Sequence, residues 1–209
     1  MTAESDIRRA LLALDQEFGP QAPAQMAALL EALAHWNRRV NLTAIRDPDA
    51  MISAHLLDSL VVRPLLRGRR IIDIGTGAGF PGLPLAVAEP DRDFVLLDSN
   101  TKKILFVEHA IALLGLDNVL AVRSRTEDYA PAGRFDTVIA RALGPLPRLV
   151  AMAGHLVGEG GVFVALKGRY PAEELERLPD AWSYSVVQLD VPGLEPGSRN
   201  AVTMQPKKL

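Results

Sequence analysis

Four glycines between Asp73 and Gly82 are the residues in this sequence whose spacing points most directly to ligand chemistry. They follow the short β-branched run 71–74 and precede a segment with helical character. Glycine allows positive φ and lets a ligand approach the backbone closely, since no Cβ stands in the way. A strand, a glycine turn and a helix in this order indicate a nucleotide or nucleoside site, with Gly75 and Gly77 at the turn.

The residue at position 80 bears on the kind of ligand. A dinucleotide fingerprint expects glycine at the sixth position from Gly75, and this sequence has Phe80 there. The following helix also has no lysine paired with serine or threonine, as a phosphate loop would. A nucleoside without phosphates, such as S-adenosylmethionine, suits this turn better, while a dinucleotide and a purely structural turn are the alternatives.

Polar side chains follow the other predicted strands. Asp98 ends a strand and can accept hydrogen bonds from both ribose hydroxyls. The alternative is that Asp98 is only an acidic residue at the N-terminal end of the next helix. Thr126 and Glu127 can flank an adenine edge, with helix capping as the alternative for Thr126. Arg141 follows the fourth strand, where a cation meets either a methionine carboxylate or an RNA phosphate.

The charge balance limits the partners. The net charge of −2 excludes a protein that binds nucleic acid with its whole surface, so RNA contact requires a local basic patch. Candidates are Lys167, at the end of the fifth predicted strand, together with Arg123 and Arg125. Most other basic residues are expected to be solvated surface charges.

Other chemistry is excluded or not indicated. The chain has no cysteine, and its four histidines are scattered, so we expect no metal site. No residue stands out as a general base or nucleophile, so no catalytic residue is assigned. The chain has no apolar run long enough to span a membrane and no secretory signal, and we expect a cytoplasmic protein.

The elements that position these residues fall into two parts. Apolar residues at helical spacing predict helices over 6–18, 23–40 and 51–66, so residues 1–68 form a helical extension. Residues 69–209 alternate between strand and helix patterns, which predicts a doubly wound, mostly parallel α/β sheet. Two last strands, 184–191 and 200–204, predict an antiparallel hairpin. The predicted core strands are 71–74, 94–97, 119–122, 136–139 and 162–166, and its helices 81–88, 102–114, 146–157 and 172–178.

Beyond these patterns, the sequence resembles the RsmG (GidB) family of 16S ribosomal RNA guanine-N7 methyltransferases over essentially its full length. The resemblance lies in short motifs that occur in the family's order. They are WN at 36–37, NLT at 41–43, RDP at 46–48, HLLDS at 55–59, IDIGTGAGFPG at 72–82, LDS at 97–99, FD at 135–136, RA at 141–142 and LKG at 166–168.

The resemblance implies a class I methyltransferase fold, S-adenosylmethionine as the methyl donor, and 16S ribosomal RNA or the small subunit as the partner. We expect a monomer. It also implies cofactor contacts for Gly75, Phe80, Thr126, Glu127 and Arg141. This chain departs from many members at Phe80, and at Ala78, where they have proline. Because guanine N7 carries a lone pair and no proton, its methylation needs no general base. The helical extension is expected to face the RNA, and His55 is expected to be a hydrogen-bonded structural histidine rather than a functional one.

Three other functions stay open at this point. A methyltransferase for a small molecule would need no salt-sensitive basic patch. A ribosome-assembly factor with a vestigial cofactor site has no reason to retain the glycine turn, Asp98 and Glu127 together. A nicotinamide oxidoreductase is disfavoured by Phe80 and by the absence of an acid suited to hydride transfer.

Overall fold

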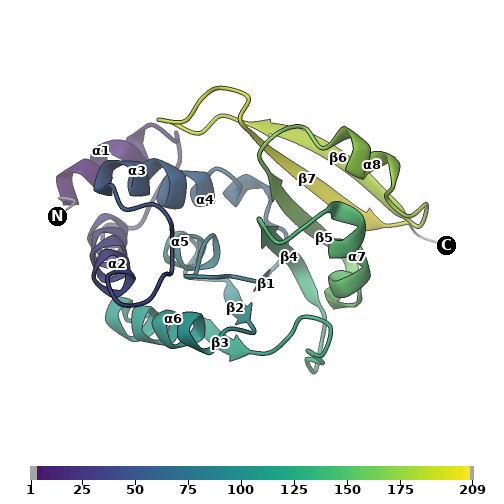
Figure 1. Ribbon diagram of the computed structural model, residues 1–209, viewed down its shortest axis with the longest axis horizontal. Coiled ribbons are helices and arrows are strands. Elements are labelled where there is room, and N and C mark those ends of the chain that lie inside the picture. Colours follow the sequence, from purple (N-terminus) through teal and green to yellow (C-terminus); the bar gives the residue numbers. More distant parts are fainter. Residues whose placement is uncertain (1–3, 208–209) are drawn as a thin grey trace.

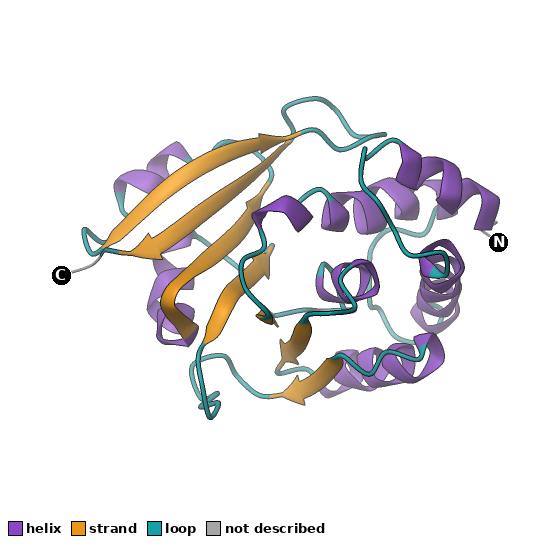
Figure 2. Ribbon diagram, turned by 180° about the vertical axis from the view of Figure 1, so that it is seen from behind, coloured by secondary structure: helices purple, strands orange, loops and turns teal. Residues whose placement is uncertain are grey.

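The computed structural model describes residues 4–207 and contains one mixed seven-stranded sheet (Figures 1 and 2). The strand order is β3-β2-β1-β4-β5-β7-β6. Strands β1 to β5 pair in parallel, whereas β7 is antiparallel to both β5 and β6. The strands are β1 (Arg70–Ile74), β2 (Asp93–Asp98), β3 (Val119–Arg123), β4 (Phe135–Arg141), β5 (Val157–Lys167), β6 (Trp182–Leu189) and β7 (Arg199–Pro206).

Helices cover both faces of the sheet. Consecutive residues of β1 point to opposite faces, so that Ile71 packs in one buried cluster and Ile72 in another. The first cluster lies under α5 (Gly82–Ala88) and α6 (Thr101–Leu114), and the second under α7 (Leu146–Ala153) and α8 (Ala172–Glu176). Asn100 caps the start of α6 by accepting from the Lys102 amide, and Gly115 ends that helix with φ of 64°.

The N-terminal helices pack against the sheet face that α5 and α6 cover, and Figure 1 shows them gathered at one end of the molecule. Their apolar side chains join those of the sheet in one buried cluster, and the Trp36 ring meets the Phe106 ring edge to face at 5.6 Å. The elements are α1 (Glu4–Leu12), α2 (Ala22–Asn37), α3 (Pro48–Met51), the π-helix η1 (Ile52–Leu57), α4 (Asp58–Leu60) and the 3₁₀ turn η2 (Arg63–Leu65).

The predicted fold class is confirmed, including the mostly parallel sheet and the C-terminal antiparallel strands, but five helices were predicted too long. Two of these differ by a few residues only: the helix predicted over 23–40 ends at Asn37, and that over 172–178 ends at Glu176. The helix predicted over 6–18 ends at Leu12, because Asp15 has φ of 50°, which lies outside the right-handed helical region. The helix predicted over 51–66 is broken into α3, η1, α4 and η2, since a π-turn interrupts it and Pro64 follows. The helix predicted over 146–157 ends at Ala153, and Val157 belongs instead to β5.

None of the helices within residues 4–207 combines the length and the apolar character needed to cross a bilayer.

Candidate cofactor site

The candidate site lies where the order of the strands reverses. Strand β1 lies between β2 and β4. The chain adds β2 and β3 on one side of β1, and the later strands, beginning with β4, on the other. Ligands of open α/β sheets bind at this point, outside the carboxyl ends of the strands. A hollow of about 540 Å³ opens there, and residues following β1, β2, β3 and β4 line it. It brings together Gly75, Phe80, Asp98, Thr126, Glu127 and Arg141, six of the seven predicted cofactor residues.

A buried carboxylate holds the glycine turn. Asp73 is fully buried, and its Oδ2 accepts from the Thr76 hydroxyl at 2.6 Å and from the Gly82 amide at 2.9 Å. Burial raises the pKa of Asp73 to about 6, while these two hydrogen bonds act in the opposite direction. The turn is therefore tied at both ends to the strand that precedes it.

Within the turn, Gly75, Gly77 and Gly79 have left-handed backbone conformations, and the first two are predicted cofactor residues. Gly75 has φ of 62° and Gly77 has φ of 63°. A Cβ on Gly75 would lie 2.5 Å from the end of the Leu143 side chain, which would have to move to make room for it. A Cβ on Gly77 would have no neighbour closer than 4.0 Å, so that position faces open space. Gly77, the seventh predicted residue, does not line the hollow itself and is connected to it through its hydrogen bond to Asp98.

Asp98 connects the turn to the end of β2. Its Oδ2 accepts from the Gly77 amide at 3.0 Å, and its Oδ1 accepts from the Asn100 amide at 2.8 Å. The Lys103 ammonium stands 3.7 Å from Oδ2. Each carboxylate oxygen has further lone pairs, so this oriented group retains acceptor capacity for ribose hydroxyls.

Phe80 lines the hollow, and His55 packs against it. The two rings stack at 4.8 Å between centroids, and His55 Nε2 shares a hydrogen bond of 2.9 Å with the Thr43 hydroxyl. Burial, and next the nearby Arg141 charge, lower the pKa of His55 to about 4. His55 is therefore neutral at pH 7. Its Nε2 has the hydrogen-bond partner expected from the sequence, whereas its buried Nδ1 has none within residues 4–207.

Arg141 belongs to a partly buried ion cluster that sequence analysis did not anticipate. Its Nη1 donates to Asp58 Oδ2 at 3.1 Å, and Arg199 Nε donates to Asp58 Oδ1 at 2.8 Å. These residues come from three distant parts of the chain, so no local pattern could connect them. The motif at 55–59 contained Asp58, but its position on an apparently amphipathic helix gave no sign of an arginine partner.

The three predicted RNA contacts have different surroundings. Arg125 lines the cofactor hollow. Arg123 is exposed and donates to the Thr101 hydroxyl at 3.0 Å. Lys167 is mostly buried: its ammonium lies 2.6 Å from Glu174 Oε2 and 2.7 Å from the Gly144 carbonyl. Contact between Lys167 and RNA would require these partners to be exchanged, and its role stays a prediction.

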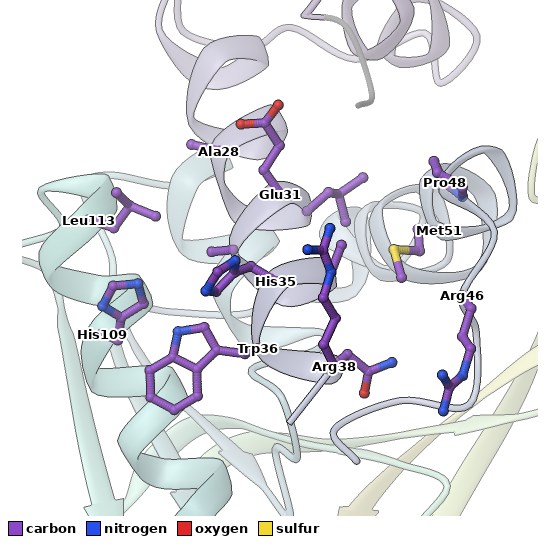
Figure 3. A pocket seen from close by; sticks show the side chains of 14 residues that line it. Ala28, Glu31, His35, Trp36, Arg38, Arg46, Pro48, Met51, His109 and Leu113 are labelled. Carbon is purple, nitrogen blue, oxygen red and sulfur yellow. The ribbon is translucent and has the colours of Figure 1, made fainter. Parts of the chain in front are cut away.

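A second and larger hollow, of about 720 Å³, lies along α2 between α6 and the loop that leads to α3 (Figure 3). In the close-up, His109 and Leu113 stand on one side of α2, and Arg46, Pro48 and Met51 on the other. Trp36 and the exposed Arg38 come from the end of α2 itself. This hollow shares no lining residue with the first, and it lacks the oriented carboxylate and the glycine turn of the cofactor site.

No group of acidic or histidine side chains within residues 4–207 has the arrangement needed to hold a metal ion.

The fold and this site define the class of protein, a class I S-adenosylmethionine-dependent methyltransferase. The chain superposes on DhpI in complex with S-adenosylhomocysteine with a TM-score of 0.58 and 21% identity, covering 86% of this chain and 98% of that one. It also superposes on coclaurine N-methyltransferase with a TM-score of 0.55 and 14% identity, covering 88% and 71%. At these identities the likeness concerns the fold.

The chain belongs to the GidB family, rRNA small subunit methyltransferase G, whose model matches residues 22–202. It is 53% identical to the Ribosomal RNA small subunit methyltransferase G of Aeromonas salmonicida over 155 residues, 74% of each chain. It is 44% identical to the protein of the same name from Nitrosococcus oceani over 208 residues, covering 98% of this chain and 96% of that one.

Proposed function

We propose that this protein transfers the methyl group of S-adenosylmethionine to N7 of a guanine in 16S ribosomal RNA. The observation that carries the proposal is the single hollow at the reversal of strand order, where six predicted cofactor residues meet in a chain of the GidB family. The guanine N7 atom as acceptor comes from the resemblance to that family.

The residues of the hollow fit the parts of S-adenosylmethionine. Asp98, held by two backbone amides, would accept from the ribose hydroxyls. Thr126 and Glu127 would flank the adenine edge, the glycine turn at Gly75 would allow close approach, and Arg141 would offer a cation to the methionine carboxylate. The bound cofactor supplies an electrophilic methyl group on a sulfonium.

Positioning is the main catalytic task of this chain. Guanine N7 has a free lone pair, so the reaction is a direct displacement for which no proton has to be removed first. His55 beside Phe80 remains neutral at pH 7, so it adds no further positive charge next to Arg141. Accordingly, we assign no general base.

We further propose that residues 1–68 act as an RNA-facing cap on a core formed by residues 69–209. The second hollow supports this, because it combines the Trp36 ring with the exposed Arg38 and Arg46, and unpaired bases stack on aromatic rings beside arginines. The proposed partner is 16S ribosomal RNA or the small ribosomal subunit, met by a monomer in the cytoplasm.

The test is methyl transfer from radiolabelled S-adenosylmethionine to ribosomal RNA and to small subunits isolated from cells that lack the endogenous enzyme. The expected product is 7-methylguanosine confined to 16S RNA after nucleoside digestion. Cofactor binding without any incorporation into RNA or subunits would contradict the proposal, and would favour a small-molecule methyltransferase or an assembly factor.

A further inference from the structure

Three cationic side chains gather at the carboxyl edge of the sheet. Arg141 ends β4, Lys167 ends β5 and Arg199 begins β7. Because β7 is antiparallel to β5, its first residues lie beside the last residues of β5, and Lys167 pairs with Asn200 in the register. The edge that opens onto the cofactor hollow therefore also carries Arg199, a residue to which sequence analysis gave no role.

The charges of these three residues are compensated unequally. Lys167 has its own carboxylate, Glu174, at 2.6 Å. Arg141 and Arg199 share a single carboxylate, Asp58, which is almost completely buried. In direct contact, the two guanidiniums share one carboxylate, while the buried Asp73 also acts on Arg141, so Arg199 is the less fully compensated of the two arginines. A partly exposed cationic cluster attracts an anion.

Arg199 is the member of the cluster best placed to meet an anion from outside. Its side chain is 31% exposed, compared with 19% for Arg141. Its Nε is bound to Asp58 and its Nη1 donates to the Ser198 carbonyl at 2.9 Å, so the guanidinium is oriented and has further N–H donors. Arg141 lines the cofactor hollow, and Arg199 does not.

We propose that Arg199 binds a phosphate of the acceptor RNA strand, and that Asp58 is the positioning residue that fixes Arg199 beside Arg141. The inference rests on the proposed function, because it names a contact of the same RNA substrate. A guanidinium is suited to this ligand, since its planar N–H donors match phosphate oxygens. The arrangement places the strand's anionic backbone beside the cofactor cleft, and the acceptor base is thereby held close to it.

The test is binding of 16S RNA fragments in the presence of S-adenosylhomocysteine at increasing KCl concentrations. Arg199→Gln is compared with Arg69→Gln, because Arg69 is also bound to a carboxylate, Asp93 at 2.9 Å, but precedes β1 at the opposite edge of the sheet. Loss of one phosphate contact weakens binding about tenfold and makes the slope of log affinity against log salt shallower by about 0.7. Arg69→Gln should keep the wild-type slope.

The affinity for S-adenosylhomocysteine and a second variant, Arg199→Lys, serve as controls. Affinity for S-adenosylhomocysteine should be unchanged in Arg199→Gln, which shows that the variant is folded, and Arg199→Lys should restore most of the slope. If Arg199→Gln keeps the wild-type dependence of RNA affinity on salt, the inference is overturned. The proposed function still holds in that case, provided that the wild-type protein methylates the RNA. If the wild-type protein neither binds nor methylates the RNA, the proposed function fails, and the phosphate contact fails with it.

Asp58→Asn tests the positioning role, because asparagine keeps the volume and removes the charge. We expect kcat for RNA methylation to fall at least tenfold while RNA affinity stays within about twofold or increases, since both arginines remain. A residue that only neutralised the arginines would tighten RNA binding and leave kcat intact. Unchanged kcat in Asp58→Asn would therefore overturn the positioning half of the proposal.

Discussion

Glycine at position 77 can be required for its left-handed backbone conformation or for the space that it leaves to a ligand. Replacing Gly77 by alanine separates these two reasons. Gly77 has φ of 63°, and a left-handed conformation costs an alanine about 1–2 kcal/mol. The added Cβ would meet no protein atom closer than 4.0 Å, so no steric clash adds to this cost. In a chain of this length each kcal/mol lowers the melting temperature by about 2–4 °C, and the variant should therefore fold.

Gly115→Ala is a matched control for Gly77→Ala. Gly115 has φ of 64° at the end of α6, and a Cβ added to it would have no neighbour within 4 Å. Its amide bonds to carbonyls of α6, whereas the Gly77 amide bonds to Asp98 of the cofactor site. The two variants should lose similar unfolding free energy in urea. In calorimetric titration with S-adenosylhomocysteine, however, Gly77→Ala should bind at least about tenfold more weakly, equivalent to about 1.4 kcal/mol, and Gly115→Ala should bind like the wild type.

Unaltered affinity in Gly77→Ala would refute the reasoning, because the open space beside Gly77 would then not be ligand space. Equal loss of affinity in both variants would refute it differently, by showing that backbone strain anywhere in the chain weakens binding.

Three other changes test the site. Asp98→Ala should weaken S-adenosylhomocysteine binding by about 10–100-fold in the same titration, because a charged acceptor for the ribose is lost, and an unchanged affinity would count against that contact. His55 has a pKa of about 4 in the folded chain and 6.5 when unfolded, so its contribution to stability is complete above pH 6.5 and is lost as pH falls toward 4. This amounts to about 3 kcal/mol, so urea unfolding of wild type and His55→Gln should converge or cross on acidification, and a constant difference would contradict the pKa. Lys167→Ala should leave S-adenosylhomocysteine affinity nearly unchanged and weaken RNA binding less than Arg199→Gln, because Glu174 already neutralises Lys167. Equal loss of cofactor and RNA affinity would rule out an RNA role for Lys167.

The parts of the fold set by local pattern were predictable from the sequence. The run at Ile71–Ile74, buried on both faces, indicated β1, and the glycines after it indicated the turn. Asp98 was predictable for the same reason, since it ends a short apolar strand. Such residues are placed by the element they belong to, and the parallel sheet then aligns the ends of its strands.

The parts set by contacts between distant segments were not predictable. Asp58, Arg141 and Arg199 are brought together by the π-helical turn and by the insertion of β7 between β5 and β6, and neither feature has a periodic signal. Lys167 was correctly placed at the end of β5, but its neutralisation depends on Glu174 of α8, which only the packing of that helix reveals.

The shared carboxylate of Asp58 has a consequence for how the molecule comes apart. It ties α4 to both β4 and β7, while the apolar side chains of α1 and α2 are buried in the same cluster as one face of the sheet. Detaching the helical extension would expose that cluster and leave two guanidiniums without their carboxylate. The extension and the sheet therefore form one cooperative unit, and they should lose their structure in a single transition rather than as separate domains.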